Sequence, residues 1–241
     1  MSFLETLFTL DGRSALVTGG NSGIGQAIAA ALAGAGAAVT VVGRDEARLA
    51  ATGYAYVAAD LAERSAVDKL AHLAPDILVN AAGVNRRPPL AELSIADWDV
   101  TLQVNLTAPF LLGQAFAPKM AANGWGRIIN IGSQQTIRAF GNSGAYGVSK
   151  AGVAALTRSQ AEAWSPYGVC CNAIAPGFVH TPMTEPVFSD PERTAAMAAR
   201  TMIGRNGELA DFVGVAVFLA SPASDFVTGQ TIFVDGGFSA K

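Results

Sequence analysis

Tyr146 and Lys150 are spaced i, i+4, so on a helix both side chains lie on one face and reach the same ligand. Upstream, Ser133 follows the apolar run 127–131, which predicts a strand that ends near Gly132. A phenol, an ammonium and a hydroxyl that meet at one point can move a proton on or off a secondary alcohol. These three residues therefore predict acid/base chemistry at a carbonyl or carbinol group.

The pKa of the phenol must be lowered for it to act as a base at neutral pH, because an unperturbed tyrosine has a pKa near ~10. A unit charge at about 4 Å, in an effective dielectric of about 20, stabilises the phenolate by roughly 4 kcal/mol. We therefore expect Lys150 to lower the pKa of Tyr146, although desolvation takes part of the effect back. In the alternative interpretation, Tyr146 is a half-buried helix aromatic and Lys150 is solvated. The Y-x-x-x-K spacing alone favours this alternative.

Length and composition favour one globular unit. The chain has 241 residues, 51% of them hydrophobic and 15% charged, with a formal net charge of −3. This charge offers no basic surface for nucleic acid or an anionic membrane. The two cysteines, Cys170 and Cys171, are adjacent, which predicts no disulfide framework and favours a reducing, cytoplasmic location. The two histidines, His72 and His180, lack metal-ligand spacing, so we expect no metal site.

The first eleven residues are apolar enough to raise the question of a signal peptide. They lack a basic start and a cleavage motif, and Glu5 interrupts them. We expect an N-terminal arm over 1–11 that packs on the domain or on a partner subunit. No apolar run approaches the ~20 residues of a membrane span.

Short apolar runs alternate with helical stretches along the whole chain. The runs predict strands over 14–18, 38–42, 54–58, 76–80, 127–131, 169–174 and 230–234. The stretches between them predict helices over 25–35, 62–73, 97–120, 145–164 and 210–219. This alternation predicts an α/β fold in a single domain over 1–241: a doubly wound Rossmann fold with a seven-stranded parallel sheet flanked by helices.

One proline-containing stretch, residues 178–206, interrupts the alternation. It is long for a loop and follows the carboxyl end of a predicted strand, where ligands bind in such folds. We expect it to form a substrate lid. The alternative is a surface excursion with a short helix.

A glycine-rich turn joins the first predicted strand to the first predicted helix. Gly19, Gly23 and Gly25 give the spacing G-x-x-x-G-x-G. Glycines let the backbone turn sharply beside a pyrophosphate, and the helix N-terminus offers N–H donors to it. We interpret the turn as a dinucleotide site rather than a tight turn without a ligand.

The end of the second predicted strand bears on the choice of cofactor. Folds that prefer NAD usually place a carboxylate here, whereas this chain has Gly43 followed by Arg44. A guanidinium suits a 2′-phosphate, so NADP(H) is the expected cofactor. NAD(H) stays open, because a shift of register would bring Asp45 to this place. Arg44 as a solvated residue at a helix start is the other alternative.

These residues resemble the short-chain dehydrogenase/reductase family. The family's motifs occur in its order and approximate spacing: Thr18-Gly19-x-x-x-Gly23-x-Gly25, Asp60, Asn80-Ala-Ala-Gly83, Asn105, Ser133, Tyr146, Lys150, Pro176-Gly177 and Thr181. The resemblance runs from about Leu10 to the end of the chain. Ala81 departs from the family's Asn-Asn-Ala-Gly pattern, and the stretch between Arg44 and Asp60 is short, which predicts a second helix of about two turns.

The resemblance implies roles for individual residues. Tyr146 would be the acid/base, Lys150 would lower its pKa and hold the nicotinamide ribose, and Ser133 would bond the substrate oxygen. Asn105 would hold a water that links Lys150 to solvent; the residue alone suggests instead a side chain bonding its own helix backbone. The implied cofactor contacts are Thr18, Gly19, Asn21, Ser22, Gly23, Ile24, Gly25, Arg44, Asp60, Leu61, Asn80, Ala81, Ala82, Gly83, Tyr146, Lys150, Pro176, Gly177, Val179 and Thr181.

The substrate is expected to be a polyol, a ketose or a sugar acid. The strings 85–90, 133–135 and 179–191 resemble the family's sugar-acid and ketose branches: gluconate 5-dehydrogenases, 2-deoxygluconate or keto-deoxygluconate dehydrogenases and L-xylulose reductases. Arg86, Arg87 and Arg138 are candidates to meet a carboxylate, or are surface charges. The expected substrate contacts are Ser133, Gln135, Asn142, Tyr146 and His180.

Two other functions stay open from the sequence. One is reduction of 3-oxoacyl thioesters or apolar ketones, and the other is nucleotide binding by a regulator without catalysis. The small-residue-rich segments 97–120 and 145–164 suit a packed face between subunits, and the resemblance implies a homotetramer or homodimer.

Overall fold

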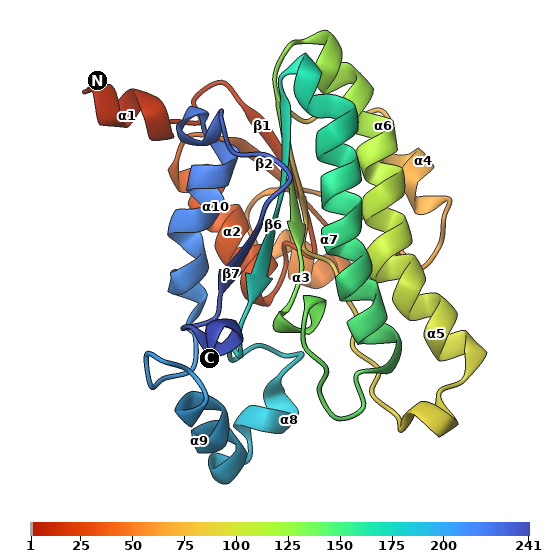
Figure 1. Ribbon diagram of the computed structural model, residues 1–241. Coiled ribbons are helices and arrows are strands. Elements are labelled where there is room, and N and C mark those ends of the chain that lie inside the picture. The colour runs from red at the N-terminus through yellow and green to blue at the C-terminus, as the bar shows by residue number, and fades with distance from the viewer. Residues whose placement is uncertain (1) are drawn as a thin grey trace.

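Seven runs of mostly apolar residues form one parallel sheet in the computed structural model, which describes residues 2–241 (Figure 1). The strands are β1 (Ser14–Thr18), β2 (Ala38–Gly43), β3 (Ala55–Ala58), β4 (Ile77–Asn80), β5 (Gly126–Ile131), β6 (Val169–Pro176) and β7 (Thr231–Val234). Their order is β3-β2-β1-β4-β5-β6-β7, and every neighbouring pair is parallel. The predicted doubly wound fold is confirmed, and each predicted strand lies within two residues of an observed one.

The order in which strands are added to the sheet reverses between β1 and β4. The chain moves outward from β1 to β2 and β3, then returns to place β4 on the other side of β1. Such a reversal opens a crevice at the carboxyl ends of the two central strands. Thr18, the last residue of β1, closes the bottom of this crevice. Its hydroxyl oxygen accepts hydrogen bonds from the N–H groups of Ala81 (3.1 Å) and Ala82 (3.2 Å), just after β4.

Helices cover both faces of the sheet because the central strands are apolar on both sides. On one face lie α2 (Gly23–Gly34), α3 (Glu46–Ala50) and α10 (Val213–Ala220), which bury Ile28, Leu32, Leu49 and Leu219 against the strands. On the other face lie α4 (Ala66–Leu70), α6 (Ala108–Ala122) and α7 (Gly144–Trp164). Figure 1 shows α2 and α10 on one side of the sheet and α6 and α7 on the other.

Two predicted helices differ from the observed ones. The helix expected over 62–73 shrinks to α4, because turns with bonds from Ala62 to Asp60 and from Ala66 to Glu63 occupy its first part. The helix expected over 97–120 is α5 (Ile95–Leu102), a π-helical turn (Gln103–Thr107) and then α6. The helix in the short connection after Arg44 is α3, whose five residues are fewer than the two turns that were expected.

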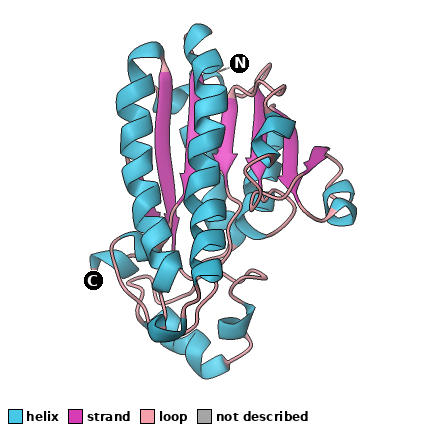
Figure 2. Cartoon of the chain, turned by 90° about the vertical axis from the view of Figure 1, so that its right-hand side faces the viewer, coloured by secondary structure: helices cyan, strands magenta, loops and turns pink. Residues whose placement is uncertain are grey.

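Two segments lie outside the layers. Residues 3–8 form α1 (Phe3–Phe8), which lies near residues 222–224; Met1, the first residue of the predicted arm, is outside the described residues. The predicted lid, residues 178–206, contains α8 (Glu185–Phe188) and α9 (Pro191–Ala199). Both short helices lie beyond the carboxyl ends of the strands (Figures 1 and 2). No helix between residues 2 and 241 is long and apolar enough to cross a membrane.

Candidate active site

Helix α7 and the end of β5 bring the predicted acid/base residues together. Tyr146 and Lys150 lie one turn apart on the buried face of α7, with 9% and 5% of their surfaces exposed. The Lys150 ammonium donates a 2.6 Å hydrogen bond to the Ile131 carbonyl and lies 5.6 Å from the Tyr146 ring centroid. Ser133, two residues after β5, lines the same cavity as Tyr146 and Lys150, and its hydroxyl is close enough to the phenol to affect the pKa of Tyr146. The predicted grouping of phenol, ammonium and hydroxyl is therefore present.

The electrostatics of Tyr146 differ from the expectation. Burial raises the pKa of Tyr146 above its usual value, while the nearby Ser133 hydroxyl and the charge of Arg87 act in the opposite direction. The expected lowering by Lys150 is not found in this structure, because the ammonium points to the Ile131 carbonyl and burial dominates. Tyr146 is consequently a protonated acid at neutral pH.

The pKa of Lys150 is shifted in the opposite direction from that of Tyr146. Burial without a carboxylate partner lowers its pKa to about 8. The side chain is therefore still mostly charged at pH 7, and it loses its proton within a range that an enzyme assay reaches. A buried ammonium of this kind is a frequent mark of a functional site.

Asn105 lies in the π-helical turn between α5 and α6. Its amide oxygen accepts a 2.9 Å bond from the Val84 N–H, and its amide nitrogen donates to the Val84 carbonyl (2.9 Å) and the Ser149 hydroxyl (3.0 Å). The alternative that this side chain bonds its own helix backbone is therefore wrong. The π-helical turn aims the amide at the segment after β4, and such turns are frequent at functional sites.

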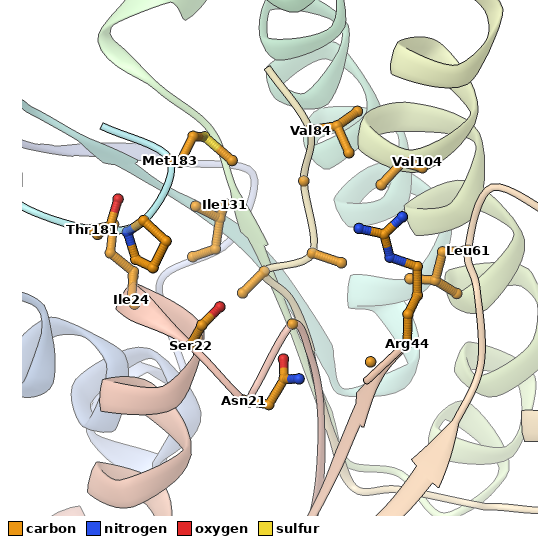
Figure 3. Close-up of a pocket in the computed structure, with 18 of the residues that line it drawn as sticks. Asn21, Ser22, Ile24, Arg44, Leu61, Val84, Val104, Ile131, Thr181 and Met183 are labelled. Carbon is orange, nitrogen blue, oxygen red and sulfur yellow. The ribbon is translucent and has the colours of Figure 1, made fainter. Parts of the chain in front are cut away.

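A cavity of about 360 Å³ runs along the carboxyl ends of the strands, from the glycine-rich turn to Tyr146. Thr181 and Met183 of the lid line one side, and Arg44, Leu61, Val84 and Val104 line the other (Figure 3). Among the predicted residues, the cavity is lined by Gly19, Asn21, Ser22, Gly23, Ile24, Gly25, Arg44, Asp60, Leu61, Ala81, Ala82, Gly83, Ser133, Tyr146, Lys150, Pro176, Gly177, Val179 and Thr181.

Two predicted cofactor contacts lie beneath the cavity instead of on its wall. Thr18 is 1% exposed and holds the backbone after β4, as described above. Asn80 is 4% exposed and donates a 2.8 Å bond to Asn130 in the neighbouring strand. Both residues shape the wall from behind.

Three predicted substrate contacts are also absent from the lining. His180 bonds Glu185 at 2.6 Å and stacks on Phe188 within the lid. Asn142 is exposed in a turn and has a φ of 57°. The Gln135 amide oxygen is buried without a hydrogen-bond partner. Of the predicted substrate residues, the cavity brings together Ser133 and Tyr146 only.

The close backbone packing of the glycine-rich turn leaves no room for a side chain at two of its glycines. Gly19 has a φ of 67°, and a Cβ there would lie 2.9 Å from the Cα and N of Ala82. A Cβ on Gly25 would lie 2.4 Å from the Gly19 carbonyl oxygen. Ser22, the N-cap of α2, makes no side-chain capping bond and lines the cavity. The turn therefore presents unobstructed backbone and a hydroxyl at a helix N-terminus, which suits a pyrophosphate.

The end of β2 settles the register that the sequence left open. Gly43 is the last residue of β2 and pairs with Ala58, so Asp45 lies beyond the strand. The Asp45 carboxylate caps α3 by accepting a 3.1 Å bond from the Arg48 N–H. The Arg44 guanidinium is largely exposed, lines the cavity and lies 3.9 Å from Asp60. This end of the cavity therefore presents a largely exposed cation on a long side chain. Two carboxylates lie beside it, those of Asp45, which caps α3, and of Asp60.

Several wall residues were not predicted from the sequence. Arg48 follows Arg44 by one turn, which was a usable signal for a second cation at this end. Val100 and Val104 are also spaced by one turn, but their place on the wall depends on the π-helical turn. Met183 reaches across from the lid, and its methyl group would lie 3.8 Å from a Cβ on Gly83. The described residues contain no cluster of three acidic, histidine or cysteine side chains that could ligate a metal.

Comparisons with known proteins identify the family of the chain. A family model described as "Enoyl-(Acyl carrier protein) reductase", of the short-chain dehydrogenase type, matches residues 19–239. The chain is 40% identical to gluconate 5-dehydrogenase of Gluconobacter oxydans (strain 621H) over 250 residues, covering 98% of each chain. It is 38% identical to 2-dehydro-3-deoxy-D-gluconate 5-dehydrogenase of Bacillus subtilis (strain 168) over 254 residues, covering 100% of each.

A solved structure is equally similar in sequence. The crystal structure of a gluconate 5-dehydrogenase from Burkholderia cenocepacia J2315 in complex with NADP and tartrate superposes with a TM-score of 0.92 at 40% identity, covering 99% of each chain. Matches of this extent, together with the observed fold and the Ser133, Tyr146 and Lys150 geometry, show that the chain belongs to the short-chain dehydrogenase/reductase family of oxidoreductases.

Proposed function

We propose that this protein is an NADP(H)-dependent oxidoreductase that interconverts a secondary alcohol and a ketone on a sugar acid, with Tyr146 as the general acid/base. The observation that carries the proposal is one continuous cavity. It begins at Arg44 and the glycine-rich turn and ends at Ser133, Tyr146 and Lys150. A cofactor bound along it would bring its reactive end to the acid/base group.

The chain's own residues fit the dinucleotide. The backbone around Gly19 and the Ser22 hydroxyl would hold the pyrophosphate at the N-terminus of α2. Arg44, with Arg48 one turn away, would bind a 2′-phosphate, and the engagement of Asp45 as a cap favours NADP(H) over NAD(H). When bound, the nicotinamide supplies hydride transfer, whereas the protein supplies orientation and proton transfer.

Proton transfer follows from the buried phenol. In the reductive direction, the Tyr146 hydroxyl donates its proton to the ketone oxygen, which the Ser133 hydroxyl also bonds. The raised pKa of Tyr146 keeps that proton in place at neutral pH. The Lys150 ammonium, 5.6 Å from the ring centroid, would offset part of the burial cost of the phenolate that forms, while the pKa of Tyr146 stays raised overall.

A sugar acid is favoured among polar substrates by the arginines beside the site. Arg86 lines the cavity and pairs with Asp97. Arg87 lies outside the lining and donates a 2.5 Å bond to the Gly141 carbonyl, but its positive charge reaches the Tyr146 phenol. A carboxylate on the substrate would bind Arg87 by charge-assisted hydrogen bonds. The names of the gluconate and deoxygluconate dehydrogenases that the chain resembles support the same substrate class.

A substrate panel tests the proposal. Keto sugar acids, the matching ketoses without a carboxylate, polyols and a 3-oxoacyl thioester would each be tried with NADPH and NADH, following the cofactor's absorbance. We expect the highest kcat/KM with a keto sugar acid and NADPH. Arg87→Ala should raise KM for the keto acid by about tenfold and leave the neutral ketose unchanged.

Other results on the panel would overturn the proposal. A preference for the thioester would indicate the acyl reductase alternative. NADPH binding without turnover of any carbonyl would indicate a nucleotide-binding regulator.

The assembly we propose is a homodimer or homotetramer, with α5, α6 and α7 providing a face between copies. Ile95, Phe110 and Val148, one on each helix, expose 75%, 46% and 49% of their surfaces. Exposed apolar side chains on neighbouring helices favour an interface, and symmetric assemblies are the common form. Light scattering should give a dimer or a tetramer, and Phe110→Glu should lower that mass; a monomer would refute the assembly.

A further inference from the structure

Residues 235–241, which we call the C-terminal brace, fold back beneath the active site. Asp235 shapes this segment, since its carboxylate accepts bonds from the N–H groups of Gly237 (3.0 Å) and Ser239 (2.8 Å). The brace borders the cavity wall, because a Cβ on Gly177 would lie 2.8 Å from the Asp235 Cα. In Figure 1 the C-terminal end lies at the same edge of the sheet as α8 and α9.

The brace is bonded to the 134–143 loop, which connects Ser133 to the helix carrying Tyr146. The Arg138 guanidinium donates to the backbone oxygens of Ser239 (2.8 Å) and of the last residue, Lys241 (2.6 Å). The Phe140 ring packs on Phe238 with centroids 5.7 Å apart, and Phe238 is 2% exposed. Arg138, which the sequence offered as a carboxylate ligand, is therefore directed at backbone oxygens in this structure.

The brace is also bonded to the far end of the lid segment. The Gly236 carbonyl accepts bonds from the N–H groups of Met202 (2.8 Å) and Ile203 (3.2 Å). The Arg200 guanidinium lies 4.3 Å from the centroid of Phe238 and 5.3 Å from that of Phe140. The rings of Phe140, Phe238 and Phe178 pack together, and Phe178 is at the start of the lid.

We propose that the C-terminal brace is a positioning element of the active site, through which Arg138 and Phe238 hold the 134–143 loop and the lid in the geometry that binds the substrate. None of these residues lines the cavity, so they act through other residues. The two elements they join flank the end of the cavity where Ser133 and Tyr146 lie. This inference rests on the proposed function only for the identity of the substrate.

The test removes the contacts without opening the aromatic cluster. Deletion of residues 239–241 removes the carbonyls that Arg138 binds but keeps Phe238, and Lys241→Ala is its matched control because it keeps the backbone carbonyl. Arg138→Met removes the donors, and Arg138→Lys keeps one. The readouts are kcat and KM for a keto sugar acid, the Kd of NADPH by fluorescence, and amide hydrogen exchange over residues 134–143 and 201–203.

The deletion and Arg138→Met should lower kcat/KM by about 10- to 100-fold, mainly through KM, because small misplacements near reacting groups are costly. The Kd of NADPH should stay within about twofold, since neither Arg138 nor any of residues 239–241 lines the cavity, and Asp235 beside Gly177 is kept in every variant. Exchange over 134–143 and 201–203 should accelerate. Arg138→Lys should recover part of the loss, and Lys241→Ala should match wild type.

Unchanged kcat/KM and unchanged exchange in both variants would overturn the inference. So would a parallel loss of NADPH affinity, which would indicate general destabilisation. If wild type reduced none of the ketones, the proposed function would fail, whereas hydrogen exchange would still decide whether the brace holds the loop and the lid.

Discussion

The ammonium of Lys150 lies 5.6 Å from the ring centroid of Tyr146, yet its 2.6 Å hydrogen bond goes to the carbonyl of Ile131 at the end of β5. The lysine is thus anchored to the sheet, and its charge stays near the phenol without bonding it. Burial raises the pKa of the phenol and lowers that of the ammonium, so both are protonated at neutral pH. This pairing suits proton donation to a ketone and makes the oxidative direction dependent on higher pH.

Tyr146→Phe should remove proton transfer while preserving the cavity, because only the hydroxyl is lost. We expect kcat for ketone reduction to fall by about 10²- to 10⁴-fold, the usual contribution of a positioned general acid. The Kd of NADPH, measured by fluorescence titration, should stay within about twofold, since one hydroxyl contributes little to a large ligand. A variant as fast as wild type would remove Tyr146 from the mechanism.

Lys150→Met should alter how stability depends on pH in the ligand-free protein. Below pH 8 the folded state holds a buried ammonium, which costs free energy relative to the solvated lysine of the unfolded chain. Above pH 8 the folded lysine is neutral while the unfolded one keeps its proton up to its ordinary pKa of 10.5, so wild type gains stability as pH rises through this window.

Urea unfolding of both proteins between pH 7 and pH 10 measures this effect. The free energy of unfolding of wild type minus that of Lys150→Met should increase with pH above 8, by up to about 3 kcal/mol. A pH-independent difference would contradict the lowered pKa. Because Met cannot bond Ile131, the difference at one pH mixes several causes, and only its slope reports the titration.

Gly19→Ala and Gly12→Ala form a matched pair. Both glycines have positive φ, 67° and 78°, so each alanine costs about 1–2 kcal/mol of backbone strain. A Cβ at position 12 meets nothing within 4 Å, whereas one at position 19 lies 2.9 Å from the backbone of Ala82. Both variants should lower the thermal unfolding temperature, but only Gly19→Ala should weaken NADPH binding in a fluorescence titration. Equal affinities would place the cofactor elsewhere.

The sequence predicted the sheet well, because short apolar runs buried on both faces leave few alternatives for their structure. It failed where tertiary contacts decide the local structure. The break between α5 and α6 depends on the bonds of Asn105 to Val84, which no pattern within the helix reveals. The helix expected over 62–73 is shortened to α4, because turns occupy its start.

In the candidate site, too, the residues identified by local spacing were predicted well, and those whose position depends on tertiary contacts were not. Spacing within one turn or one strand end identified Gly19, Ser133, Tyr146 and Lys150, and all four line one cavity. Three of the predicted substrate contacts, Gln135, Asn142 and His180, are not part of the lining, since the partner of a loop side chain depends on tertiary contacts or on the local turn. His180 is engaged with Glu185 in the lid, and Arg138 reaches the carbonyl of Ser239 about a hundred residues away.

Arg44→Ala should change the preference between cofactors. If the guanidinium binds a 2′-phosphate, its loss removes charge-assisted hydrogen bonds worth about 1.5–3 kcal/mol, which is roughly 10- to 100-fold in the Kd of NADPH. The Kd of NADH, which lacks that phosphate, is the internal control and should change by less than about threefold. Equal losses for both cofactors would assign Arg44 a different role, such as its ion pair with Asp60.

Asn105→Ala should separate a structural function of the π-helical turn from a catalytic one. The amide bonds both backbone groups of Val84 and the Ser149 hydroxyl, so its loss leaves polar groups without partners and should lower the free energy of unfolding by about 2–3 kcal/mol. Val84 lines the cavity, and a Cβ on its neighbour Gly83 would lie 3.9 Å from the Lys150 ammonium.

Loss of the bonds that fix Val84 in the cavity wall should therefore lower kcat even at temperatures where the variant is fully folded. Asn105→Asp provides the comparison, because it keeps the acceptor for the Val84 N–H but cannot donate to the Val84 carbonyl. Urea unfolding and steady-state kinetics would be measured on both variants. A folded Asn105→Ala variant with wild-type kcat would limit Asn105 to stability, whereas a loss in both variants would show that the reaction needs the amide's donor bonds to the Val84 carbonyl and the Ser149 hydroxyl.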